Sequence, residues 1–111
     1  RDKVLTHNHP VELGFSNEDI ELAFFNKLSE IRAVTGKYTY SLSPTSIPSE
    51  DTIKEMMKEY RKTSKLVRVK LTDEYNSGKI SIEEFRENFD HEQITMLSNT
   101  KFGKYFKYSR K

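Results

Sequence analysis

The sequence predicts a mixed α/β domain, with a sheet built mainly from its first half and a helical hairpin in its second half. Short apolar segments with the character of strands occur at residues 3–7, 31–34 and 38–42, and a segment of helical period separates the first two. Residues 49–98 then carry apolar side chains at three- and four-residue steps, which is typical of amphipathic helices. The order β-α-β-β followed by helices favours a mixed sheet with a helix on one face.

The length of 111 residues suits a single domain with a modest core. A charged fraction of 32% makes the chain polar, but 12% aromatic residues argue against disorder. The net charge of +2 is too small to indicate nucleic-acid binding by itself. There is no cysteine, which excludes disulfides and thiolate metal sites. No apolar run is long enough to span a membrane, so we expect no membrane segment.

The first half of the chain yields its elements in the order strand, helix, strand, strand. Residues 3–7 are expected to form a short buried strand, and Ser16 is the expected N-cap of the helix that follows. The expected core face of that helix consists of Ile20, Ala23, Phe24, Lys27 and Leu28. Strands at 31–34 and 38–42 are joined by a turn at Gly36 and Lys37, and the Ser-Pro-rich residues 43–48 form a loop.

The second half is expected to fold as a helical hairpin with a strand after it. The first helix starts after Ser49, and its expected core face consists of Ile53, Met56, Met57, Tyr60, Val67, Leu71 and Tyr75. Gly78 ends this helix in the manner of a C′ glycine, and Ser81 with Glu84 forms a capping box for the second. The second helix is expected to run through Ile82, Phe85, Phe89 and Leu97, and the last strand to cover 104–109.

We therefore expect one domain over residues 1–111, with a core at 1–43, a helical hairpin at 49–98 and a terminal strand at 104–109. The chain does not start with methionine, so we expect it to be a fragment, a processed product or a trimmed form of a larger protein.

The most informative stretch for function is Thr6-His7-Asn8-His9-Pro10 together with Ser16-Asn17-Glu18-Asp19. Side chains at i and i+2 on a strand point to the same face, so His7 and His9 can converge on one point. Two imidazoles and the Asp19 carboxylate, with water at an open position, would make a catalytic zinc site. A plainer interpretation is equally available: the histidines are surface residues, and Ser16 with Asp19 forms a capping box.

His-x-His-Pro, a short loop and Ser-x-x-Asp resemble the core motif of the JAB/JAMM (MPN) metallopeptidases and their RadC-type bacterial relatives. The resemblance implies a JAB/cytidine-deaminase-like core in which His7, His9 and Asp19 bind Zn²⁺ and Ser16 is a catalytic helper that stabilises the oxyanion. The loop of six residues between His9 and Ser16 is one residue shorter than usual in the family. The shorter loop and the sequence of residues 30–42 together are most similar to the JAB-like region at the C-terminal end of some phage head-morphogenesis (minor capsid) proteins.

The resemblance implies a zinc metallopeptidase or isopeptidase, a hydrolase within a phage or prophage head protein. Its partners would be a protein or peptide substrate or other head proteins, in the bacterial cytoplasm or the virion. The family's general acid/base glutamate lies on a strand upstream of the histidines, and Asp2 does not fit that role. The mechanism is therefore a hypothesis about the intact protein. The main alternative is a non-catalytic structural or partner-binding domain with a degenerate motif. A DNA-associated module, by analogy with the RadC-type relatives, is a third possibility.

Three other features have both a functional and a plain interpretation. Residues Asp73 to Glu84 have the length of an EF-hand calcium loop, but Tyr75 occupies a ligand position, and a helical hairpin yields the same spacing. His91 is expected to be a surface or helix-packing residue rather than a partner of the zinc site. The basic and aromatic tail, residues 101–111, suits nucleic-acid binding, but strand residues that alternate between core and solvent explain it equally well.

Overall fold

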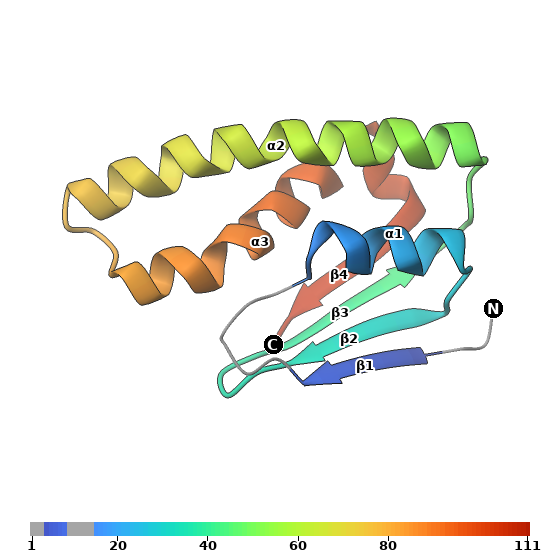
Figure 1. Cartoon of the computed structure of the whole chain (residues 1–111), viewed down its shortest axis with the longest axis horizontal. Coiled ribbons are helices and arrows are strands. Elements are labelled where there is room, and N and C mark those ends of the chain that lie inside the picture. Colours follow the sequence, from blue (N-terminus) through green and yellow to red (C-terminus); the bar gives the residue numbers. More distant parts are fainter. Residues whose placement is uncertain (1–3, 9–14) are drawn as a thin grey trace.

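The computed structural model describes residues 4–8 and 15–111 and has a mixed α/β fold (Figure 1). Its elements are β1 (Val4–Asn8), α1 (Asn17–Phe25), β2 (Glu30–Val34), β3 (Thr39–Pro44), α2 (Glu50–Asn76), α3 (Ile82–Ser98), the 3₁₀ helix η1 (Lys101–Tyr105) and β4 (Phe106–Arg110). The predicted order of strands and helices is confirmed, including the helical hairpin between β3 and the last strand.

The four described strands form one sheet in the order β1-β2-β3-β4. β1 pairs with β2 in parallel, which is possible because α1 provides the crossover between them. β2 pairs with β3, and β3 with β4, in antiparallel register. The last strand begins at Phe106, two residues after the predicted start, because residues 101–105 complete a 3₁₀ helix first.

The helices cover one face of the sheet, as the alternation of burial along the strands shows. Ile31, Ala33, Tyr40, Leu42 and Phe106 are buried, whereas the residues between them are exposed or partly exposed. One core cluster joins this sheet face to α1, to the first three turns of α2 and to the second half of α3. In Figure 1 the distal part of the α2–α3 hairpin extends beyond the sheet.

Two predicted core positions differ in the structure. α1 ends at Phe25, and Lys27 lies beyond it with a φ of 52°, in the left-handed conformation that closes the helix. Tyr75 is 45% exposed although it continues the three- and four-residue pattern of α2. Each four-residue step turns a helical position by about 40°, so repeated steps carry Tyr75 away from the core face.

The predicted helix through Ile82, Phe85, Phe89 and Leu97 is confirmed as α3, and the structure adds which of its residues are buried. Its buried residues are Glu87, Gln93, Ile94 and Leu97. Ile82 is exposed, and Phe85 and Phe89 are half-buried, because the first turns of α3 lie in the distal part of the hairpin, outside the main core cluster. Among the described residues, no helix has an apolar stretch long enough to cross a membrane.

Candidate functional site

The predicted metal motif includes the end of β1 and the first turn of α1, and residues 9–14 between them lie outside the described part of the chain. His7 is the penultimate residue of β1 and pairs in register with Ala33 of β2. Its partner Ala33 is buried beneath the helices. His9 lies outside the described residues, so the predicted convergence of His7 and His9 stays a prediction.

Ser16 and Asp19 form the capping box that the sequence predicts. The Ser16 Oγ accepts a hydrogen bond from the Asp19 backbone N–H at 3.2 Å, and the Asp19 Oδ2 accepts one from the Ser16 N–H at 3.0 Å. The plain interpretation of these two residues therefore describes a real interaction. A carboxylate has two oxygens, so metal binding by Asp19 would have to coexist with this hydrogen bond to Oδ2.

α2 and α3 also reach the region around the first turn of α1. Tyr60 of α2 is fully buried, and its hydroxyl has no hydrogen-bond partner within the part of the chain that the structure describes. Burial raises the pKa of Tyr60, and the negative charges of Asp90 and Asp19 raise it further. The sequence predicted Tyr60 as a core residue but did not indicate that its hydroxyl would be buried.

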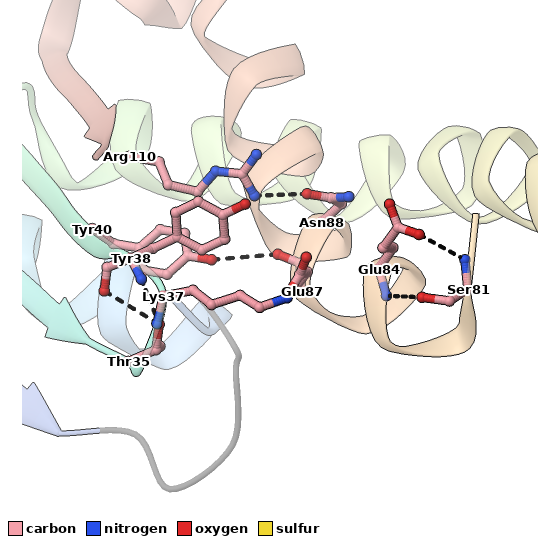
Figure 2. Close-up of polar contacts among 9 residues, drawn as sticks. All are labelled: Thr35, Lys37, Tyr38, Tyr40, Ser81, Glu84, Glu87, Asn88 and Arg110. Atoms are coloured by element: carbon pink, nitrogen blue, oxygen red, sulfur yellow. Dashed lines mark hydrogen bonds and ion pairs between the residues drawn. The ribbon is translucent and has the colours of Figure 1, made fainter. Parts of the chain in front are cut away.

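A buried carboxylate joins α3 to the β2–β3 hairpin (Figure 2). The side chain of Glu87 is 6% exposed, and its Oε2 lies 3.2 Å from the Nζ of Lys37. The Tyr40 hydroxyl donates a hydrogen bond to the Glu87 backbone carbonyl at 3.4 Å. Sequence analysis missed Glu87, although its position seven residues before Ile94 places it on the same side of the helix.

Arg110 makes the second connection between α3 and the sheet (Figure 2). Its Nη1 donates a hydrogen bond of 2.7 Å to the Asn88 Oδ1, and its guanidinium lies over the ring of Tyr38, 4.3 Å from the ring centroid. The last residue of β4 is therefore held between α3 and the residue that precedes β3. These contacts position α3; they do not by themselves form a catalytic arrangement.

His91 belongs to this junction between α3 and the sheet, in agreement with its interpretation as a helix-packing residue. Its Nδ1 is 2.8 Å from the hydroxyl of Tyr108 on β4, and the two rings are in contact. Burial lowers the pKa of His91, and the positive charge of Arg110 lowers it further, while Glu92 acts in the opposite direction. Burial also raises the pKa of Tyr108.

Residues Asp73 to Glu84, considered above as a possible calcium loop, form the junction of a helical hairpin. Asp73 lies within α2, and its backbone carbonyl accepts a hydrogen bond from the Ser77 N–H. The Glu84 carboxylate accepts a hydrogen bond of 3.0 Å from the Ser81 N–H in a second capping box. Gly78 has a φ of 79° between the two helices. The helix stop and start signals thus account for the spacing.

Most aromatic side chains of the tail, residues 101–111, pack within the folded protein. Phe102 and Phe106 are buried in the core, and Tyr108 contacts His91. Lys101 and Lys104 lie over the rings of Phe102 and Tyr105. Packing within the fold therefore accounts for these rings, although residues 101–105 form a 3₁₀ helix rather than an alternating strand, and the rings do not form an exposed stacking platform.

Searching the described residues for three or more histidine, cysteine, aspartate or glutamate side chains that could hold a metal ion finds no such group. Because His9 lies outside those residues, this finding does not bear on the predicted set of His7, His9 and Asp19. Comparison with known proteins finds no matching family, curated protein or solved structure.

Proposed function

We propose that this protein is a JAB/JAMM-like zinc-binding module of a phage or prophage head protein. The observation that carries the proposal is the placement of the motif. His7 is at the carboxyl end of a strand that is parallel to its neighbour, and Ser16 to Asp19 form the first turn of the crossover helix. Ligand sites in such α/β arrangements lie beyond the carboxyl ends of parallel strands.

In this proposal His7, His9 and Asp19 hold the metal, and their two imidazoles and one carboxylate are ligands that suit zinc. When bound, zinc would supply an activated water for attack on a peptide or isopeptide carbonyl. The hydroxyl of Ser16, at the N-terminus of α1, would help to stabilise the negative charge that develops on the carbonyl oxygen. Hydrolysis would be an activity of the intact head protein, which would supply a general-base carboxylate.

A second candidate is a structural or partner-binding domain in which the motif serves only to start α1. The reciprocal capping box favours it, because both Ser16 and Asp19 already have a structural role there. This candidate has no need of zinc and tolerates any residue at position 19 that preserves the cap.

Replacing Asp19 by asparagine separates the two candidates. The amide oxygen of Asn can still accept the Ser16 N–H, but the anionic metal ligand is lost. The zinc-site proposal predicts one tightly bound zinc ion per chain in the wild type. For D19N it predicts that affinity falls by more than the roughly 10- to 100-fold that loss of an outer-shell partner causes. Metal content by mass spectrometry and zinc titration by calorimetry measure both quantities.

Glu84→Gln is the matched control, because it makes the same change in the capping box of α3, away from the motif. It should leave zinc binding unchanged, whereas His7→Ala combined with His9→Ala should abolish it. A wild-type protein without zinc affinity, or equal zinc affinity in wild type and D19N, would refute the metal site and leave the structural candidate.

A further inference from the structure

The central part of α2 carries a concentration of positive charge that neither candidate function uses. Residues 58–70 include six basic residues and one acidic residue, although the whole chain has a net charge of only +2. Lys58, Lys62 and Lys65 recur at steps of four and three residues, so they lie along one face of the helix. We call these three residues the lysine stripe.

The lysine stripe lies on the side of α2 that faces solvent. All three lysines are exposed, whereas Tyr60, Thr63 and Val67, on the opposite side of the same turns, are buried. In Figure 1, α2 forms an outer edge of the molecule along its whole length. The stripe covers about 10 Å along the helix axis, given the rise of an α-helix.

Within the described part of the chain, the other basic residues of this segment have identified partners and the lysine stripe has none. Arg61 lies 3.6 Å from Glu21, Lys70 pairs with Glu92 at 2.6 Å, and Arg68 lies over the ring of Phe89. Among the described residues, no ion pair or side-chain hydrogen bond involves Lys58, Lys62 or Lys65. Lys58, Lys62 and Lys65 are exposed, and no contact found among the described residues gives them a role in packing α2 against the core.

The composition of this face indicates what kind of partner fits it. Lysine is depleted at the centres of protein interfaces, and the large apolar side chains exposed beside the stripe on α2 are Leu66 and Val69, towards one end. A helix that binds a membrane surface needs an apolar face for the lipid, and the apolar face of α2 is buried in the core. Unpaired, regularly spaced lysines instead suit the phosphates of a nucleic-acid backbone.

We propose that the lysine stripe of α2 is a nucleic-acid contact surface that binds the sugar–phosphate backbone without reading base sequence. On the same helix, Glu55 lies one turn before Lys58, Glu59 lies between Lys58 and Lys62, and Asp73 lies about two turns after Lys65. The contact is therefore short, with about one phosphate per lysine. Binding is weak and depends strongly on salt, because it rests on the release of counterions.

The test measures binding of the protein to a fluorescent 20-base-pair DNA duplex of arbitrary sequence by anisotropy, between 50 and 200 mM salt. Three phosphate contacts predict a slope of log affinity against log salt of about −2.7, or roughly a 40-fold loss over this range. Changing Lys58, Lys62 and Lys65 together to glutamine should reduce affinity at least about ten-fold and remove most of this slope. The midpoint of thermal unfolding should stay close to that of the wild type, because the three side chains are exposed.

The matched control changes Lys101, Lys104 and Lys107 to glutamine, with the same loss of net charge in the tail. It should retain most of the affinity and of the salt slope. An equal loss in the control, or stronger binding to poly-glutamate or to anionic vesicles than to the duplex, would overturn the proposal. The His7→Ala, His9→Ala protein should bind the duplex normally, so this result is independent of the zinc site.

Discussion

Among the residues that the structure describes, His91 is the one whose titration should most affect stability near neutral pH. Burial and Arg110 lower its pKa in the folded protein below the value of about 6.5 that it has when unfolded. As pH falls through 6.5, the unfolded chain binds this proton first. The free energy of unfolding therefore decreases, until pH falls below the folded pKa and the loss stops.

Chemical denaturation between pH 7.5 and 5, compared between wild type and His91→Gln, measures this effect. In the variant, the free energy of unfolding should lose the part of its pH dependence that His91 causes. The contributions of His7 and His9 to this pH dependence should be the same in both proteins. NMR titration of the His91 ring gives an independent measure. A folded pKa at or above the ordinary value would contradict the buried environment beside Tyr108.

At the same scale, the sequence identified Ser16 and Asp19 as a capping pair and as candidate site residues, and the structure shows the capping pair directly. The local pattern was sufficient because both hydrogen bonds join residues only three positions apart. Glu87 was missed, because its partner Lys37 is fifty positions away and no local pattern connects them.

Two helices of this protein end with the same backbone arrangement but with different residues. Beyond α1, Leu28 N–H bonds to Ala23 C=O around Lys27, and beyond α2, Lys79 N–H bonds to Glu74 C=O around Gly78. Both are Schellman motifs with a left-handed residue at C′. Glycine adopts this conformation without strain, but lysine does not.

We therefore predict effects of opposite sign at the two positions. Lys27→Gly should stabilise the protein, and Gly78→Ala should destabilise it by about 1 kcal/mol, because only the alanine adds strain at a positive φ. Nothing lies within 4 Å of a Cβ at Gly78, so Gly78→Asn should recover part of the loss. Equilibrium denaturation of the three variants measures the changes.

Gly103 provides the contrasting control. A Cβ there would lie against the Ser98 backbone carbonyl, so alanine and asparagine should both destabilise η1 strongly. We assign the loss at Gly78 to backbone strain and the loss at Gly103 to close packing. If asparagine is more stable than alanine at position 103 but not at position 78, this assignment is wrong.

At the scale of the whole molecule, the hairpin combines a part inside the core with a part outside it. Met56, Tyr60, Ile94 and Leu97 belong to the main core cluster, whereas Val67 and Leu71 are buried outside it. Regions with fewer contacts to the core open at a lower free energy than the rest. The distal end of the hairpin should therefore open locally while the sheet stays folded.

Hydrogen exchange of the backbone amides tests whether the distal end of the hairpin opens locally. Amides in residues 72–76 and in the first turns of α3 should exchange faster than those around Met56 and Met57 in the same helix. Uniform protection along α2 would show that the hairpin and the sheet open only together.

The sequence by itself determined the order of the described strands and α-helices, the mixed α/β class and the starts of the described α-helices at Ser16, Ser49 and Ser81. These depend on interactions between residues a few positions apart, which a local pattern records. Only the tertiary structure decided which face of α3 is buried, where β4 begins, and that Glu87, Asn88 and His91 join α3 to the sheet. Those features depend on contacts between distant segments, and the folded chain alone determines which segments meet.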